Sequence, residues 1–239
     1  MISKNLADVA RRIDEAFALV VRPGQRPPLL VAVSKEKPVE CVVEAYSCGQ
    51  RHFGENKVQS LLEKSTSVKI KSLCPEIKWH FIGRIQSNKI RQLTSVPNLH
   101  MIQTIDSAKH ALALDVAWHS ICSNPLAVML QVNTSGEEQK SGVEPSQLLE
   151  LYKTVHATCP HLTIVGIMCI GRYGHDHTAT PNPDFLELVA CRQLLCDNLG
   201  LKPEDVELSM GMSADFEHAI QLGSTVVRIG TTIFGERSH

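Results

Sequence analysis

The sequence lacks a long hydrophobic run and an excess of charge of either sign. No apolar stretch approaches the roughly 20 residues that a transmembrane helix needs, and charges interrupt residues 1–17, where a signal peptide would be apolar. The 24 basic and 25 acidic residues are mixed along the chain and give a net charge of −1. The sequence therefore has no basic excess of the kind that attracts nucleic acid or an anionic membrane. We therefore expect a cytoplasmic protein that binds neither nucleic acid nor a membrane.

The sequence also lacks a paired cysteine motif and a strong metal-binding motif. None of its eight cysteines forms a Cys-x-x-Cys pair, and four that lie in apolar segments are expected to be small core residues with free thiols: Cys41, Cys48, Cys169 and Cys191. His175 and His177 flank Asp176, but they lie in a loop rich in glycine, proline and threonine without helical spacing. We expect no metal site.

The chain shows no linker or shift in composition, so residues 1–239 are expected to form one domain. Apolar residues spaced by three and four positions between Leu6 and Val20 predict a first helix. Eight candidate strands follow, with helical patterns between them, at residues 29–34, 51–56, 78–83, 99–105, 125–133, 162–171, 206–212 and 225–230. Several are nearly continuous apolar runs, which is typical of a covered parallel sheet. The pattern favours an α/β fold, a (β/α)₈ TIM barrel with an extra N-terminal helix; a doubly wound open sheet is the alternative.

Lys35 ends the first predicted strand, where a barrel places its active-site residues. Loss of hydration at the rim of the barrel would lower the pKa of its amine and leave more neutral amine to attack a carbonyl. Lys35 is therefore a candidate Schiff-base lysine. The alternative is a lysine that only ends the strand and extends its ammonium group to solvent.

The last two strand ends are candidates for an anion site. Ser213 is expected to begin a helix, whose free N–H groups favour anions, and Gly230 and Thr231 follow the eighth strand. Barrels of this kind often bind phosphate with the loops after strands seven and eight. Asp215 and Glu217 argue against this interpretation, because their charges would repel a phosphate; two ordinary strand-to-helix turns are the alternative.

Two further residues are expected at the barrel mouth. Arg228 lies two positions before Gly230 on the same strand and should face the same side, and Asn56 ends the second strand. A lysine amine opposite a phosphate cradle would hold a phosphorylated aldehyde. Pyridoxal 5′-phosphate and a sugar phosphate both fit this description.

The chain resembles the pyridoxal phosphate homeostasis protein family along nearly its whole length. The matching segments are AVSKEKPVE, FGENKVQ, WHFIGRIQSNK, QVNTSGEEQKSGVEP, GIMCIG and LSMGMSADFEHAIQLGSTVVRIGTTIFGER. The resemblance implies a barrel similar to the N-terminal domain of alanine racemase, with the cofactor pyridoxal 5′-phosphate held as an internal aldimine on Lys35. It also implies that Ser213, Gly230 and Thr231 bind the phosphate, that Arg228 lies by the pyridine nitrogen, and that Asn56 lines the site.

The chain departs from the family pattern at Lys57, where an aromatic residue is frequent, and at Arg84, where proline or glycine is common. Both positions are expected near the mouth, so they affect its shape and charge and, through them, cofactor affinity or partner choice.

Two functions of different class follow: an amino-acid racemase, or a protein that holds and delivers the cofactor without catalysis. An arginine at the pyridine nitrogen weakens the cofactor as an electron sink. A racemase of this fold also needs a second acid/base from an added domain, whereas this chain ends at His239 and offers only Tyr173 in a suitable loop. We expect a monomeric carrier whose partners are apo-enzymes that receive the cofactor, with weak racemase activity or a lysine-dependent aldolase as alternatives.

Overall fold

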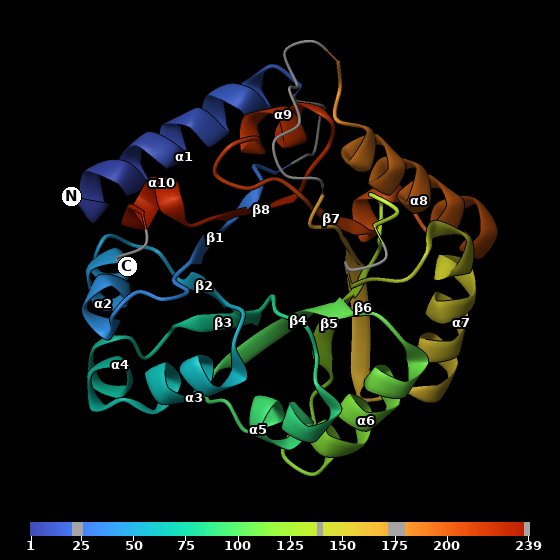
Figure 1. The fold of residues 1–239 in the computed structure, drawn as a ribbon, viewed down its shortest axis with the longest axis horizontal. Coiled ribbons are helices and arrows are strands. Elements are labelled where there is room, and N and C mark those ends of the chain that lie inside the picture. The colour runs from blue at the N-terminus through green and yellow to red at the C-terminus, as the bar shows by residue number, and fades with distance from the viewer. Residues whose placement is uncertain (21–25, 138–140, 172–179, 237–239) are drawn as a thin grey trace.

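The computed structural model describes residues 1–20, 26–137, 141–171 and 180–236, and within them eight parallel strands close into one barrel. The strands follow each other around the barrel in chain order, as Figure 1 shows. Their bounds are β1 Leu29–Val33, β2 His52–Glu55, β3 Lys78–Phe81, β4 Leu99–Ile105, β5 Leu126–Gln131, β6 Leu162–Met168, β7 Glu207–Ser209 and β8 Val226–Ile229. The predicted (β/α)₈ barrel is confirmed, and the open sheet is excluded because β8 pairs with β1.

Helices cover the outside of the barrel (Figure 1). Those within the described residues are α1 Ile2–Ala18, α2 Val39–Ser47, α3 Val58–Thr66, α4 Val68–Leu73, α5 Ile90–Thr94, α6 Ala108–His119, α7 Leu148–Thr158, α8 Pro183–Leu199, α9 Phe216–Gln221 and α10 Thr231–Phe234. Short 3₁₀ turns cover Ser87–Lys89, Pro145–Gln147 and Pro203–Asp205. The predicted N-terminal helix is confirmed: α1 packs on α9 and α10, outside the last two strands. No helix of the described ranges is both long and apolar enough to cross a lipid bilayer.

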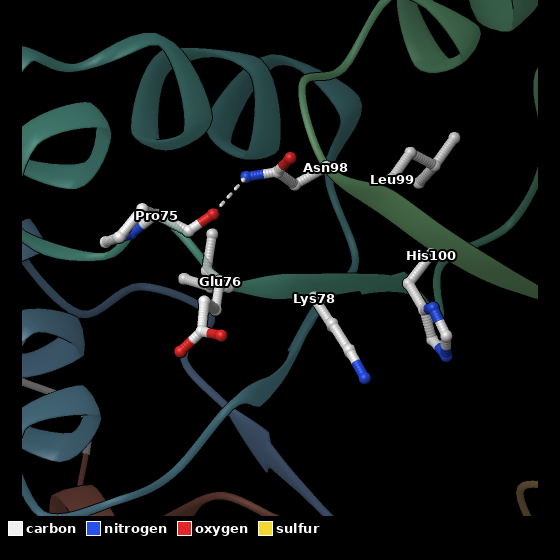
Figure 2. A pocket seen from close by; sticks show the side chains of 7 residues that line it. Pro75, Glu76, Lys78, Asn98, Leu99 and His100 are labelled. Atoms are coloured by element: carbon white, nitrogen blue, oxygen red, sulfur yellow. Dashed lines mark hydrogen bonds between the residues drawn. The ribbon is translucent and has the colours of Figure 1, made fainter. Parts of the chain in front are cut away.

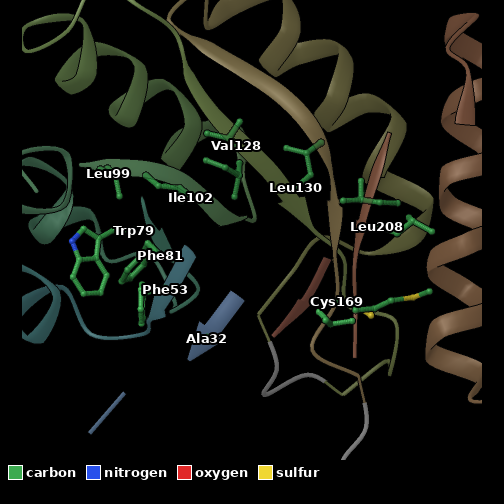
Figure 3. Packing of buried hydrophobic residues seen from close by; sticks show 14 of the residues in the cluster. Ala32, Phe53, Trp79, Phe81, Leu99, Ile102, Val128, Leu130, Cys169 and Leu208 are labelled. Atoms are coloured by element: carbon green, nitrogen blue, oxygen red, sulfur yellow. The ribbon is translucent and has the colours of Figure 1, made fainter. Parts of the chain in front are cut away.

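The main hydrophobic core lies between the strands and the outer helices. Phe53, Trp79 and Phe81 are buried in this layer and project from neighbouring strands, as Figure 3 shows. A second, smaller cluster joins residues from five strands: Val31, Met101, Met129, Met168 and Val226. Because side chains alternate across a strand, this second cluster fills the inside of the barrel.

Seven of the eight predicted strands are longer than the observed ones, most clearly β7, whereas β4 has the predicted bounds. Residues 206–212 were expected to be extended, but the strand ends at Ser209, and Gly211 adopts a φ of +96°, outside the extended region. The cysteine prediction was partly wrong: Cys48 is exposed and Cys41 only half-buried, because both lie near the outer face of α2, whereas Cys169 and Cys191 are buried. All eight cysteines are free thiols.

Candidate functional site

The predicted site residues gather at the carboxyl ends of four neighbouring strands. Lys35 follows β1, Asn56 follows β2, Ser213 follows β7, and Gly230 and Thr231 follow β8. The barrel order places β7, β8, β1 and β2 side by side, so these residues share one sector of the rim. Arg228 lies inside β8, opposite Val31 of β1.

Buried polar groups fix the turn that carries Lys35. The Ser34 hydroxyl donates to Glu55 Oε1 at 2.6 Å, and Lys64 Nζ lies 2.6 Å from the same oxygen and 2.7 Å from the Ser34 carbonyl oxygen. That carbonyl also accepts the N–H of Lys37 at 3.1 Å. Because Ser34, Glu55 and Lys64 are all buried, the backbone on either side of Lys35 has little freedom. Lys35 itself is half-buried.

The sequence analysis missed Glu55 and Lys64. The available signal was an acidic residue at the end of an apolar strand, since a carboxylate in that position must be paired or hydrogen-bonded. The lysine nine residues later lies on α3, directly outside β2, and supplies the pair.

Ser213 links the loops that follow β7 and β8. Its Oγ accepts the N–H of Gly230 at 3.3 Å and the N–H of Thr232 at 3.4 Å. Two backbone donors and one hydroxyl therefore converge at this point of the rim, and both backbone bonds are long enough to be shared with another acceptor. Such a group of N–H and O–H donors suits an oxyanion.

Ser213 does not begin a helix, contrary to the prediction. It lies in a turn, and α9 begins at Phe216, because the Asp215 carboxylate turns back to accept the N–H of Met212 at 2.7 Å. The donors at this site therefore come from the loop after β8 rather than from the start of α9.

The two acidic residues that argued against an anion site have partners of their own. Glu217 Oε1 lies 2.6 Å from Nη2 of Arg12, a residue of α1 on the outside of the barrel. The Asp215 carboxylate accepts a hydrogen bond from the Met212 N–H. Their charges are thus offset by positive charge or by hydrogen bonding, which weakens the objection.

Gly230 lies in a tightly packed part of the barrel. A Cβ at this position would lie 3.1 Å from the Val33 carbonyl oxygen and 3.4 Å from Val33 Cβ. At Gly83, after β3, a Cβ would lie only 2.0 Å from the carbonyl oxygen of Asn56. Both glycines hold neighbouring strand ends close together, and Gly83 fixes the backbone position of Asn56.

Arg228 is buried and bound by neutral groups. Its Nη1 donates to the Ser209 hydroxyl at 2.6 Å and its Nη2 donates to the Cys169 carbonyl oxygen at 2.8 Å. Burial lowers the pKa of the Arg228 guanidinium, and the negative charge of Asp215 offsets part of that effect. Its Nε has no hydrogen-bond partner among the described residues.

Burial also raises the pKa of the neighbouring Cys169 thiol to about 12, so this thiol stays protonated.

A chain of hydrogen bonds runs from Arg228 through the inside of the barrel. Ser209 Oγ donates to Gln103 Oε1 at 2.6 Å, Gln103 Nε2 lies 3.0 Å from His80 Nδ1, and His80 Nε2 lies 2.8 Å from His52 Nδ1. An amide nitrogen can only donate, so His80 accepts at Nδ1 and donates from Nε2. Each member therefore donates to the next, away from Arg228. We call this chain the interior relay.

The sequence analysis did not identify the other four members of the interior relay. Each is a polar residue within a strand, and strand alternation alone does not show which polar residues meet inside a closed barrel.

Asn56 and Lys57 lie at the mouth. Asn56 is half-buried, and its side-chain amide makes no hydrogen bond with the described part of the chain. Lys57 Nζ lies 3.7 Å from Glu36 Oε1, beside Lys35. Arg84 is exposed. Tyr173, His175 and His177 lie outside the described residues.

The chain is similar to proteins of known family along its whole length. No family model matches it. The pyridoxal phosphate homeostasis protein of Bos taurus is 53% identical over 238 residues, which are 98% of this chain and 86% of that protein. PipY of Synechococcus elongatus, solved with PLP bound, is 29% identical with a TM-score of 0.79 over 98% of this chain and all of that one. An alanine racemase of Corynebacterium glutamicum shares the fold, with a TM-score of 0.64 and 16% identity over the whole of this chain and 61% of that one.

Replacing Lys64 with Met should destabilise the protein by about 3–5 kcal/mol, because the Glu55 carboxylate would stay buried without its cation. The double variant Glu55→Gln, Lys64→Met should recover much of that loss, since it leaves no unpaired charge. Urea unfolding of the two single variants and the double variant measures the difference. A double variant no more stable than Lys64→Met would contradict the role given to this pair.

Proposed function

Because the chain belongs to the pyridoxal phosphate homeostasis protein family, we propose that it binds pyridoxal 5′-phosphate and acts in the homeostasis of this cofactor rather than in catalysis. The observation that carries the proposal is the meeting of the Gly230 and Thr232 N–H groups at Ser213 Oγ, in the same rim sector as Lys35. The relatives' names supply the cofactor, and these donors match its phosphate.

The loops after β7 and β8 would hold the phosphate group. The N–H groups that now bind Ser213 Oγ would donate to it, together with the hydroxyls of Ser213 and Thr231. Charge-assisted bonds of this kind are shorter and stronger than the bonds of 3.3 and 3.4 Å that they replace. Thr231 is exposed at the first position of α10, so its hydroxyl can reach a ligand.

Lys35 would hold the cofactor through its amine, because a neutral lysine amine can form a Schiff base with an aldehyde with loss of water. The buried contacts of Ser34 with Glu55 and Lys64 fix the backbone beside Lys35, which reduces the entropy lost when its side chain is held in one orientation.

Arg228 would hold the pyridine ring of the cofactor, with its Nε N–H as the donor left for the ring nitrogen. Its two terminal nitrogens are already held by Ser209 and Cys169, so the orientation of the guanidinium plane is set before the cofactor arrives. A cation at this position leaves the pyridine nitrogen unprotonated and weakens the ring as an electron sink. This favours storage and delivery over carbanion chemistry.

The protein is proposed to act in the cytoplasm as a single-domain monomer that transfers the cofactor to apo-enzymes. Eight free thiols are typical of a reducing compartment. The half-buried Asn56 and the exposed Lys57 and Arg84 lie where a recipient would approach. The alternative function is that of a weak amino-acid racemase. Conversion of D- or L-alanine by the protein with bound pyridoxal 5′-phosphate would indicate this function.

Replacing Lys35 with Ala should abolish the visible absorption band of the Schiff base while the protein stays folded. Borohydride should fix the cofactor on wild-type protein, and mass spectrometry should locate it on Lys35. Lys37→Ala is the matched control, because Lys37 is two residues away and its Nζ binds the Glu236 carbonyl oxygen at 2.5 Å; it should keep the band. Attachment at another lysine would refute the assignment.

Replacing Ser213 with Ala should weaken retention of pyridoxal 5′-phosphate by about 1–3 kcal/mol, the usual effect of losing a hydrogen bond to a charged group. Equilibrium dialysis measures the change, with the exposed Ser95→Ala as control. Inorganic phosphate should compete less well in the variant. Equal retention in Ser213→Ala and Ser95→Ala would remove Ser213 from the phosphate site.

A further inference from the structure

Three histidines meet at the amino-terminal end of the barrel strands, opposite the site described above. His52 is the first residue of β2, His80 lies in β3, and His100 is the second residue of β4. One ring nitrogen from each lies within 4.8 Å of the others, and this is the one such cluster of potential metal ligands in the described ranges. His80 is fully buried, whereas His52 and His100 are half-buried.

A β-bulge brings His100 into the cluster. Trp79 pairs with Leu99 and His80 pairs with Met101, so His100 is an extra residue on β4 between two consecutive pairs. A bulge changes the direction in which a side chain points. Here it lets the His100 ring lie beside the His52 and His80 rings even though Met101, the next residue, faces the inside of the barrel.

The three rings have the spacing of a metal site. Their centres are 5.1, 5.1 and 5.2 Å apart, and the ring planes are inclined at 51°, 79° and 59° rather than stacked. Three imidazoles that bind one tetrahedral Zn²⁺ with bonds of about 2.0–2.1 Å would have their centres about 5 Å apart. The positions of the rings therefore need little change to accept an ion.

A hydrogen bond already joins two of the candidate ligand atoms. His80 Nε2 donates to His52 Nδ1 at 2.8 Å. An ion bound between these two nitrogens would replace that hydrogen bond and use the lone pair of each.

We propose that His52, His80 and His100 bind a borderline-soft divalent ion of the Zn²⁺ type, with water as the fourth ligand. The site lies at the opposite end of the barrel from the proposed cofactor site, and the interior relay joins the two. Gln103 is the supporting partner. When His80 Nε2 binds the ion, the ring proton lies on Nδ1, and a turned Gln103 amide accepts the hydrogen bond from Nδ1–H in place of the one its Oε1 now accepts from Ser209 Oγ.

Solvent reaches the site through a surface depression of about 290 Å³, lined by residues 75–78 and 98–100. Figure 2 shows the Lys78 and His100 side chains on the same side of their strands. Lys78 is the cation that faces the cluster, since its charge acts on all three histidines. It is exposed, so its ammonium group can move away, but its charge lowers the affinity for a dication.

The test is a titration of chelator-treated, full-length protein with Zn²⁺ and with Co²⁺ in the absence of cofactor. We expect one ion per chain, competition between the two metals, and a Co²⁺ spectrum of nitrogen and oxygen ligands without a thiolate charge-transfer band. His100→Phe and His52→Gln should each lower the affinity at least ten-fold. Lys78→Met should raise it. Circular dichroism shows whether each variant is folded, and the two half-buried positions are used so that His80 stays intact.

His119→Gln is the matched control, because it removes an exposed imidazole from α6. It should bind the ion as tightly as the wild type. Equal affinity in folded His100→Phe and His52→Gln would overturn the proposal, as would a thiolate band, which would assign the ion to a cysteine. Loss of affinity in His119→Gln alone would place the ion on the surface of α6 instead.

Discussion

The site depends on the pairing between the first and last strands of the barrel. Four consecutive residue pairs join β1 to β8, from Leu29 with Val226 to Ala32 with Ile229. This register places the turn of Lys35 next to Gly230, although about 195 residues of chain lie between them. A Cβ at Gly230 would lie 3.1 Å from the Val33 carbonyl oxygen, so the glycine lets β1 and β8 lie close together beside the proposed anion site.

The inside of the barrel is more polar than its apolar strands indicate. Val31 and three methionines fill part of it, but the interior relay from Arg228 to His52 fills another part. Every buried member of this relay has a partner, which is the condition under which a polar interior is stable. The relay also explains how a buried guanidinium is held by neutral acceptors, with Asp215 acting on it only through its charge.

The sequence predicted much of this structure. All eight strands and the first helix are where the apolar pattern placed them, and Lys35, Asn56, Ser213 and Gly230 gather at the rim because parallel strands bring their carboxyl ends together. The start of α9 was misplaced, since the bond from the Met212 N–H to Asp215 depends on a local turn and leaves no periodic signal. The histidine cluster could not be predicted, because it requires the bulge at His100 and the closure of the barrel.

The two lysines at the end of β1 and on α3 differ in a way that affects the chemistry of the rim. Lys64 is buried, and its ammonium group is held by Glu55 and the Ser34 carbonyl oxygen, so it cannot readily move toward a ligand. Lys35 is half-buried on the neighbouring turn. The ion pair with Glu55 therefore gives the Lys64 amine a structural role beside the rim. Under the proposed function, the surroundings of each lysine, and not its functional group, decide which amine meets an incoming electrophile.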